Sequence, residues 1–367
     1  MNYIKLNETR VLYVDPISYS AHKYYNTNNI RILSKICRLS IYVKSNYIES
    51  SCFKLEKQIY WDEKYCWDNI PHKSRIGFFV RTMFALRHNI LFAFNVFKKN
   101  NYDMIIFSCI DLPLFSFLTK FKKTKNIFLI DHGLYLAIER KYVRFFWKHL
   151  NERINVCLLE EYFYQFLRRD LKVKNPVYLL KHPISQNISL NENEIEKVSD
   201  KYLIFAPSSS NSLYFAKKLS ESSSLIPKNI KIIYKSLFDY EDDNLLIYSK
   251  RLLTDEYLHY FYKSNAILIP YDNNYNYRTS GVIFDAAANN KRIILKSGNT
   301  LEYYAKKYSD IFTMFDELND FFELISSKDN ILNDHQTQFM NFIKDYDDEE
   351  ITREFVELLN RKPIEND

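Results

Sequence analysis

The sequence predicts an α/β protein of two Rossmann-like domains that face a cleft. Short apolar runs rich in Val, Ile and Tyr recur along the chain, and amphipathic helical patterns separate them. A polar stretch (181–200) divides these runs into two sets of similar size. Near-continuous apolar runs are typical of parallel strands that helices cover on both faces. The 367 residues also match the length of two domains.

The elements follow from these runs in order. In the first half the predicted strands are 10–14, 40–43, 104–107, 127–130, 156–159 and 177–180. In the second half they are 202–206, 230–234, 245–249, 266–270, 292–296 and 311–315, with helices at 211–221, 254–264, 280–289, 299–308, 317–326 and 345–362. The predicted organisation is an N-terminal Rossmann-like domain (1–185), a C-terminal Rossmann-like domain (186–345) and a C-terminal helix or tail (346–367).

The composition excludes two common nucleotide-binding classes. The chain has only 4 glycines and contains neither G-x-G-x-x-G nor a Walker A pattern, which excludes simple dinucleotide dehydrogenases and P-loop ATPases. No C-x-x-C pair or metal-ligand spacing occurs. We therefore expect free thiols at the five cysteines, Cys37, Cys52, Cys66, Cys109 and Cys157.

The sequence predicts a cytoplasmic protein that lies against the inner face of a membrane. The N-terminus lacks an apolar signal core, and no uncharged run of about 18 apolar residues occurs. Residues 1–195 hold 30 Lys and Arg against 17 Asp and Glu, a net charge of +13, whereas the remainder has a net charge of −7. Such an asymmetry indicates that the first domain meets an anionic surface or polyanion, although halves of a chain also diverge by chance.

The stretch between Asp68 and Asp103 sharpens this interpretation because it contains no acidic residue. At helical spacing, one predicted core face carries Phe79, Met83, Leu86, Ile90 and Phe97. A second, aromatic and basic set suits lipid headgroups or the acceptor, and consists of Arg81, Phe84, Arg87, His88, Phe92, Lys98 and Lys99. A helix buried on both faces would explain the aromatic residues equally well, but the arginines less well.

The segment 264–296 holds the most informative motif. A strand ends at Pro270, and Thr279, Ser280 and Gly281 open a helix that carries Asp285. Backbone N–H groups at a helix start bind anions, and Arg278 adds a planar donor for a diphosphate, while Asp285 suits ribose hydroxyls. The alternative is a plain N-cap with a solvated arginine.

The run YRTSGVIFDAAANNKRII within this segment resembles the C-terminal motif of GT-B nucleotide-sugar glycosyltransferases, and the resemblance spans roughly 252–297. It implies the GT-B fold, a nucleotide-sugar donor on the second domain and an acceptor on the first. The family's usual Glu is Asp285 here, and its usual Gly is Asn290. Tyr277 stands where retaining members often have a second Glu, so the anomeric outcome stays open.

Further candidate residues follow other predicted strands. Asp131 and His132 precede Gly133, and His132 could bind a phosphate or take a proton from an acceptor hydroxyl, with Asp131 as base or orienting group. By the resemblance, a histidine there contacts the donor sugar or its phosphate. The pyrophosphate donors predicted in the loop after 202–206 are Ser208, Ser209, Ser210 and Asn211, with Lys235 as a further phosphate ligand.

Asp15 and Asp111 also end predicted strands of the first domain, and either could be the catalytic base. His182 is interpreted as structural. Apart from Asp345-Tyr346-Asp347 in the acidic stretch of the predicted C-terminal helix (345–362), no Asp-x-Asp occurs. We therefore expect a metal-independent transferase without a cofactor, in which the helix dipole and basic side chains stabilise the leaving group.

The predicted function is sugar transfer to a hydroxyl of a lipid-linked glycan in bacterial capsule, lipopolysaccharide or exopolysaccharide synthesis. The expected partners are a nucleotide sugar, that glycan and an anionic membrane, without nucleic acid. Three alternatives stay open: a nucleotide-sugar epimerase or hydrolase, a DNA-modifying glucosyltransferase, and a degenerate GT-B protein that binds a membrane or a partner enzyme.

Overall fold

The computed structural model describes residues 3–18, 22–48, 53–62, 65, 75–120, 122, 126–184, 201–327 and 336–361. The chain divides into two compact units. Unit 1 comprises Met1–Pro183 together with Tyr346–Asp367, and unit 2 comprises Ile184–Asp345. The predicted boundary between residues 185 and 186 lies outside the described residues.

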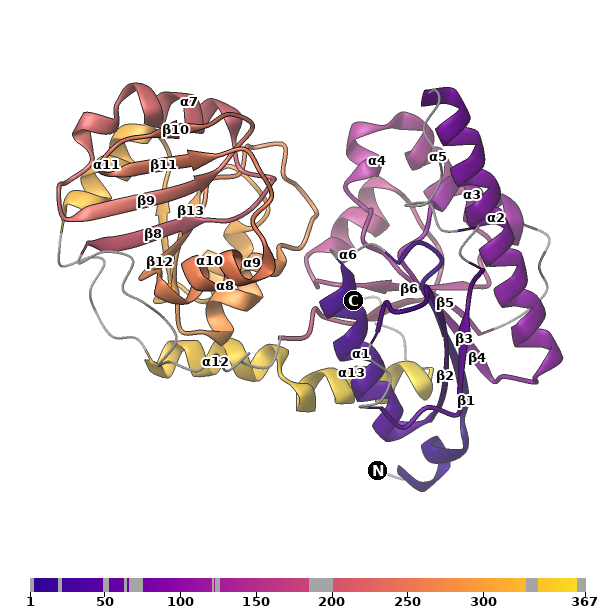
Figure 1. Ribbon diagram of the computed structural model, residues 1–367. Coiled ribbons are helices and arrows are strands. Elements are labelled where there is room, and N and C mark those ends of the chain that lie inside the picture. Colours follow the sequence, from indigo (N-terminus) through magenta and orange to yellow (C-terminus); the bar gives the residue numbers. More distant parts are fainter. Residues whose placement is uncertain are drawn as a thin grey trace. The chain divides into compact units, whose positions relative to one another are not determined.

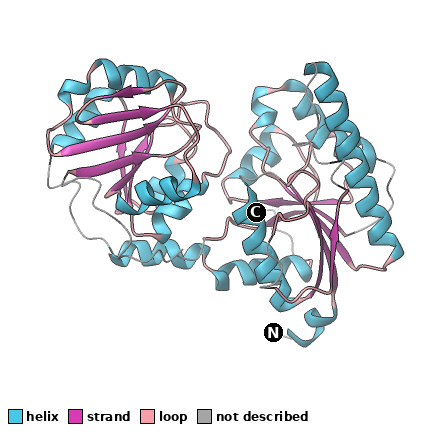
Figure 2. Ribbon diagram, viewed as in Figure 1, coloured by secondary structure: helices cyan, strands magenta, loops and turns pink. Residues whose placement is uncertain are grey.

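Unit 1 is built on a seven-stranded sheet with the order β3-β2-β1-β4-β5-β6-β7 (Figures 1 and 2). Every neighbouring pair in this sheet is parallel. The strands are β1 (Arg10–Val14), β2 (Arg38–Val43), β3 (Lys57–Tyr60), β4 (Met104–Ser108), β5 (Ile127–Ile130), β6 (Ile154–Leu158) and β7 (Val177–Leu179).

Helices cover both faces of this sheet. They are α1 (Lys23–Ile36), α2 (Arg75–Lys99), α3 (Leu112–Thr119), α4 (Leu136–Glu139), α5 (Lys141–Lys148), α6 (Phe163–Gln165) and α13 (Asp348–Leu359), and a 3-10 helix spans Tyr3–Glu8. On one face Phe107 of β4 contacts Phe94 of α2 at 5.3 Å and Phe115 of α3 at 5.1 Å between ring centroids. On the other face the Tyr13 hydroxyl donates to Asn26 of α1.

Ion pairs hold the acidic helix α13 against α1 and the segment after β7 within unit 1. Asp348 pairs with Arg31 of α1, and Lys181, which follows β7, lies 3.0 Å from Glu350 and 3.2 Å from Glu354. Glu354 is 3% exposed, so this contact is buried. The terminal helix therefore offsets part of the positive charge of the first unit, a relation that sequence distance conceals.

Unit 2 repeats the architecture with the strand order β10-β11-β9-β8-β12-β13-β14, in which only β10 and β11 pair antiparallel. The strands are β8 (Tyr202–Ala206), β9 (Ile230–Lys235), β10 (Tyr240–Glu241), β11 (Leu245–Tyr248), β12 (Ala266–Ile269), β13 (Arg292–Lys296) and β14 (Phe312–Phe315). The helices are α7 (Leu213–Glu221), α8 (Thr254–Lys263), α9 (Gly281–Ala288), α10 (Glu302–Lys307), α11 (Leu318–Ser326) and α12 (Gln336–Tyr346).

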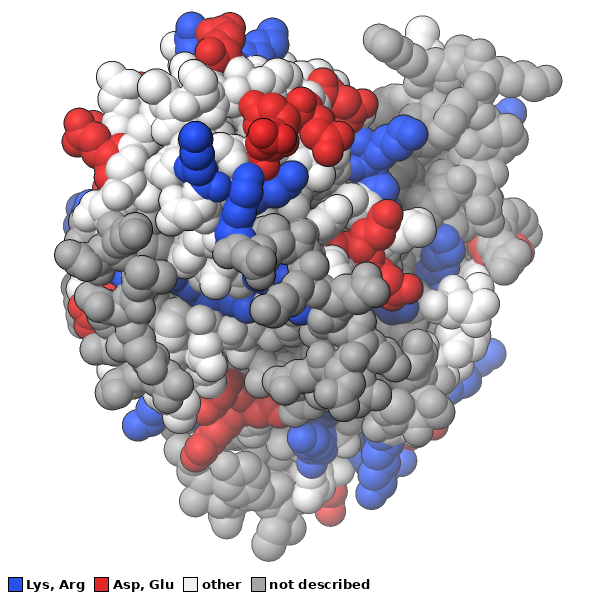
Figure 3. Space-filling model, turned by 60° about the vertical axis from the view of Figure 1, so that its left-hand side comes forward, with Lys and Arg blue, Asp and Glu red and all other residues white. Residues whose placement is uncertain are grey.

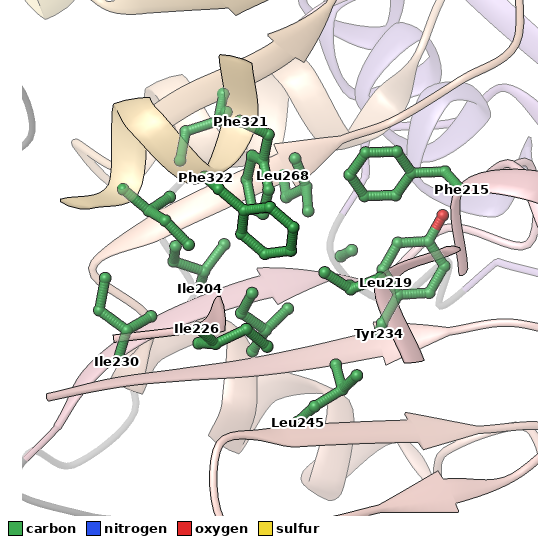
Figure 4. Packing of buried hydrophobic residues seen from close by; sticks show 14 of the residues in the cluster. Ile204, Phe215, Leu219, Ile226, Ile230, Tyr234, Leu245, Leu268, Phe321 and Phe322 are labelled. Carbon is green, nitrogen blue, oxygen red and sulfur yellow. The ribbon is translucent and has the colours of Figure 1, made fainter. Parts of the chain in front are cut away.

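One hydrophobic core cluster of unit 2 lies between its sheet and helices α7 and α11 (Figure 4). Phe215 and Leu219 of α7 and Phe321 of α11 pack on strand residues such as Ile204. The next residue, Phe205, points to the opposite face, where its ring lies 6.0 Å from that of Tyr257 in α8. In Figure 3, acidic and basic side chains both occur in small groups on the described part of the face shown.

The predicted two-sheet α/β organisation is confirmed. The structure adds two strands, β3 and β10, that the apolar pattern misses, because β3 is a polar edge strand and β10 has two residues. The prediction for Phe79 is wrong, since its side chain is 62% exposed. Burial on α2 begins at Ala85, among the side chains described, so the first turns of this helix do not cover the sheet.

Candidate functional site

The two polar loops predicted to bind the donor meet at the carboxyl ends of two neighbouring strands in the unit 2 sheet. β8 and β12 are neighbours, yet the chain leaves them toward opposite sides of the sheet, to β9 and to β13. Ligands of open α/β sheets bind at the carboxyl ends of strands at such a switch point. The loops there are 207–212, which leads into α7, and 270–281, which leads into α9.

Hydrogen bonds join these two loops. The Ser212 N–H donates to the Pro270 carbonyl at 3.0 Å, and Asn211 forms an isolated bridge with Tyr271. Within the second loop, the Tyr271 hydroxyl and the Ser280 hydroxyl lie 3.1 Å apart, so the residue that pairs with Asn211 also contacts the start of α9. The contacts place the predicted donors Ser208–Asn211 and Arg278–Gly281 side by side, although about 70 residues separate them in the sequence.

The start of α9 has the features of an anion site. Ser280 occupies the N-cap position and is 3% exposed, but its hydroxyl contacts Tyr271 and makes no capping bond to the helix. The first N–H groups of a helix need an acceptor from a side chain, water or ligand. This helix start therefore leaves its positive end available to a phosphate.

Gly281, the first residue of α9, is exposed. Beyond its chain neighbours and the backbone of its own helix, no atom of the described residues lies within 4 Å of the point where a Cβ would stand. Packing therefore does not require glycine here, whereas close approach of a ligand to the backbone would. Asp285 is half-buried and lies one turn further along the same face of the helix.

Arg278 is half-buried, and its guanidinium carbon lies 5.2 Å from the centre of the Tyr275 ring. The Tyr275 hydroxyl donates to the Thr279 carbonyl at 3.2 Å, and its ring packs on that of Tyr271 at 4.3 Å. The two tyrosines thus support both Arg278 and the backbone that leads to the helix start.

The other predicted donors are divided between exposed and structural positions. Ser209 and Ser210 are exposed, whereas the Asn211 amide donates to the Ala206 and Lys235 carbonyls. The Lys235 amine itself donates to the Ser236 and Ser249 carbonyls and lies 5.5 Å from the Tyr248 ring. Lys235 therefore ties β9 to β11 in this structure, and its role toward a phosphate stays a prediction.

Asp15 follows β1 at the switch point of the unit 1 sheet and is fully buried. One carboxylate oxygen accepts from the N–H groups of Ile17 and Ser18, at 3.0 and 2.7 Å, and the other accepts from Asn26 at 2.7 Å. Burial raises the pKa of Asp15 to about 7. These bonds fix the turn after β1, which favours a structural role over that of the base.

Asp111 has a different local role. It is the N-cap of α3, and its carboxylate accepts from the Leu114 N–H at 2.9 Å. Its side chain is half-buried. A carboxylate at this position stabilises the helix start whether or not it takes part in chemistry.

Asp131 combines burial with an available oxygen. It follows β5 and is 7% exposed, and one oxygen accepts from the Gly133 N–H at 3.1 Å. The other oxygen is buried and has no hydrogen-bond partner among the described residues. Burial raises the pKa of Asp131 to about 7, against the opposing effect of the Gly133 and Leu134 N–H groups. A carboxyl of this kind suits proton transfer near neutral pH.

His132 lies in an aromatic cluster that the sequence does not reveal. Its ring stacks on His22 at 4.4 Å and meets the edge of Tyr25 at 4.7 Å, and Tyr25 lies 5.1 Å from His182. Burial lowers the pKa of His132 well below its usual value and lowers the pKa values of His22 and His182 to about 4. All three are therefore neutral at pH 7, and His132 Nε2 has no partner in the described part of the chain.

The sequence signal for this cluster is weak. His22 precedes α1 and His182 follows β7, so only the strand order of the sheet brings them to His132. In the sequence, only the presence of a histidine after each of three predicted strands indicates this cluster.

The predicted aromatic and basic set on α2 is largely exposed. Phe84 is 63% exposed and Phe92 is 38% exposed, while His88 is half-buried and stacks on Tyr65 at 3.7 Å. The basic residues exposed along this helix are Arg81, Arg87, Lys98 and Lys99. Phe117 of α3 and Phe145 of α5 are also exposed.

Two features of the described residues bear on the predicted partners. None of their helices is both long and apolar enough to span a bilayer. They also hold no group of three or more His, Cys, Asp or Glu side chains arranged to bind a metal ion. Metal-independent chemistry stays a prediction.

Comparison with known proteins places the fold. No family model matches the chain, and no curated protein matches its sequence. Among solved structures, a glycosyltransferase from Rickettsia africae is 14% identical, with a TM-score of 0.63 over 97% of this chain and 98% of that one. Anabaena HepE in complex with UDP is 11% identical, with a TM-score of 0.63 over 96% of this chain and 100% of that one.

WaaG, a glycosyltransferase involved in lipopolysaccharide biosynthesis, is 8% identical, with a TM-score of 0.56 over 95% of this chain and 99% of that one. These likenesses extend over nearly the whole length of each chain. The chain therefore has the GT-B fold, as its motif indicates.

Proposed function

We propose that this protein is a glycosyltransferase that moves a sugar from a nucleotide diphosphate to a hydroxyl of a lipid-linked glycan. The observation that carries the proposal is the junction of the 207–212 and 270–281 loops at the unit 2 switch point. Hydroxyl groups, uncapped helix N–H groups and a guanidinium meet there, and these are the groups that bind a diphosphate. The UDP complex of HepE and the role of WaaG in lipopolysaccharide synthesis support the substrate classes.

The proposed chemistry assigns the donor to unit 2 and the acceptor to unit 1. The acceptor oxygen bonds to the anomeric carbon as the bond from that carbon to the diphosphate breaks. The hydroxyl proton passes to the Asp131 carboxylate, and the diphosphate leaves with the bonding electron pair. Arg278 and the α9 N–H groups stabilise its charge, in the way that preorganised donors stabilise other leaving groups.

Nucleotide binding is tested by thermal unfolding of the full chain with UDP, GDP, CDP or dTDP. A ligand at 100 times its Kd adds about 2.7 kcal/mol to the free energy of unfolding. We expect one base to raise the midpoint clearly.

Gly281→Ala should stabilise the free protein by up to about 1 kcal/mol, because Ala favours helices and the space is open. The same variant should lose most of the nucleotide shift, because the added methyl occupies the space of a phosphate.

Two results would contradict the donor site. The first is well-folded wild type that shifts with none of the four nucleotides. The second is a Gly281→Ala variant that keeps the full shift.

Membrane contact by unit 1 is the second part of the proposal. The exposed apolar side chains at the start of α2 are Ile76, Phe79, Val80 and Phe84. Arg81 and Arg87 lie among and after them, and no acidic residue occurs on this helix. An apolar strip beside basic side chains is the pattern of a helix that lies in an anionic lipid interface.

The combined variant Phe79→Ser and Phe84→Ser should bind anionic vesicles about 30-fold more weakly than wild type, if each ring contributes about 1 kcal/mol. Co-sedimentation with vesicles of phosphatidylcholine and phosphatidylglycerol, against phosphatidylcholine alone, measures this. Tyr214→Ser with Leu237→Ser is the matched control, because these exposed apolar residues lie on unit 2. Equal losses in both pairs, or equal binding of wild type to neutral vesicles, would remove α2 from the proposed contact.

A further inference from the structure

Hydrogen bonds tie the 270–281 loop to the segment that follows β13. The Tyr277 N–H donates to the Thr300 hydroxyl at 2.9 Å. In return, the Thr300 N–H donates to the Asn276 side-chain oxygen at 3.1 Å. We call this reciprocal pair of bonds the Thr300 clasp, formed by Asn276, Tyr277 and Thr300.

The clasp acts on a residue with an unusual backbone. Tyr277 has a φ of 51°, in the left-handed region that bulky residues rarely adopt. Such a conformation persists only where the surroundings determine it. The bond from the Tyr277 N–H to Thr300 supplies such a constraint directly before Arg278.

A second contact shows how closely the two segments approach. Gly298 has a φ of 92°, and a Cβ on it would stand 2.5 Å from the Asn273 side-chain oxygen. Asn276 also donates to the Asn273 carbonyl at 2.7 Å. The turn after β13 therefore lies against the first half of the 270–281 loop. A side chain at residue 298 would have to displace the Asn273 side chain, and the positive φ of residue 298 also favours glycine.

We propose that Thr300 is a positioning residue for nucleotide diphosphate binding. It sets the direction in which Arg278 and the α9 start present their donors, and does not itself need to touch the ligand. This inference rests on the proposed donor site, because the clasp has a functional consequence only if the 270–281 loop binds the diphosphate.

Thr300→Val removes the acceptor for the Tyr277 N–H and leaves the shape of the side chain nearly unchanged. We expect hydrogen exchange of the segment 270–281 to become about tenfold faster, and the Kd of the nucleotide that shifts wild type to rise by about the same factor. Thr300→Ser keeps the hydroxyl and should restore both values to those of wild type. Thr313→Val is the matched control, because it loses one hydrogen bond from Arg292 elsewhere in unit 2.

The two readouts separate this inference from the proposed function. If wild type binds none of UDP, GDP, CDP and dTDP, the donor site and with it the positioning role are overturned, whatever the exchange rates. If wild type binds but Thr300→Val leaves exchange of 270–281 and the Kd unchanged, the positioning role alone is overturned. A loss of affinity in Thr313→Val equal to that in Thr300→Val would show only general destabilisation and overturns it as well.

Discussion

Asp131→Asn is expected to lower the rate of sugar transfer by a factor on the order of 10² to 10⁴, the usual range for loss of a general base. The asparagine has the same size but does not accept a proton. Because burial raises the pKa of Asp131 to about 7, the wild-type rate should rise with pH through this value, where the carboxyl loses its proton. The residual rate of the variant should lack that rise.

The same substitution should stabilise the fold. The folded protein holds the Asp131 proton up to a pH of about 7, whereas an unfolded aspartate loses it near 3.8. As the pH rises from 3.8 to about 7, the free energy of unfolding of wild type therefore decreases relative to that of the asparagine variant. The difference remains at higher pH. A shift of about three pKa units corresponds to at most about 4 kcal/mol. Denaturant unfolding of both proteins at pH 5 and pH 8 measures the difference, which should be larger at pH 8.

Asp111→Asn is the control for this assignment. Asparagine is an equally good N-cap, so helix α3 should keep its stability. Transfer near the wild-type rate in Asp111→Asn, with loss in Asp131→Asn, supports Asp131 as the base. The reverse pattern would move the proton-transfer role to Asp111 and contradict the assignment of Asp131 as the base.

Sequence patterns predict the sheets well because their strands are apolar on both faces. The bounds of β1, β5, β8 and β13 agree with the predicted runs at every residue. Helix α1 gives a weaker signal, because Asn26 and Asn29 are fully buried on it and interrupt the apolar period. β3 is polar since it lies at an exposed edge of its sheet.

The candidate site shows which part of a site depends on strand order. Each polar loop of unit 2 is visible locally, as a serine cluster after one strand and as an Arg-Thr-Ser-Gly run after another. Their junction, at the bridge between Asn211 and Tyr271, follows from the adjacency of β8 and β12, which no local pattern specifies. The stacking of His22 on His132 likewise depends on the arrangement of strands in unit 1.

Arg278→Ala is expected to lower kcat/KM for transfer by about 10- to 150-fold. A hydrogen bond to a charged group contributes about 1.5–3 kcal/mol, and the negative charge on the departing diphosphate grows as the glycosidic bond breaks. The loss should therefore fall mainly on kcat, with a smaller rise in the donor KM. Arg278→Lys should recover only part of the rate, because an ammonium lacks the planar pair of donors.

Arg278 also lies over the Tyr275 ring, so its replacement affects stability as well as rate, and the two effects need to be measured separately. Loss of the cation–π contact costs about 0.5–1 kcal/mol of stability, which unfolding measurements detect separately from the kinetics. Lys217→Ala removes an exposed positive charge on α7 of the same unit and should leave kcat near the wild-type value. If Lys217→Ala and Arg278→Ala lower kcat alike, the effect comes from the overall field of unit 2. If neither lowers it, Arg278 has no part in the departure of the diphosphate, and the anion site is confined to the N–H groups at the start of α9.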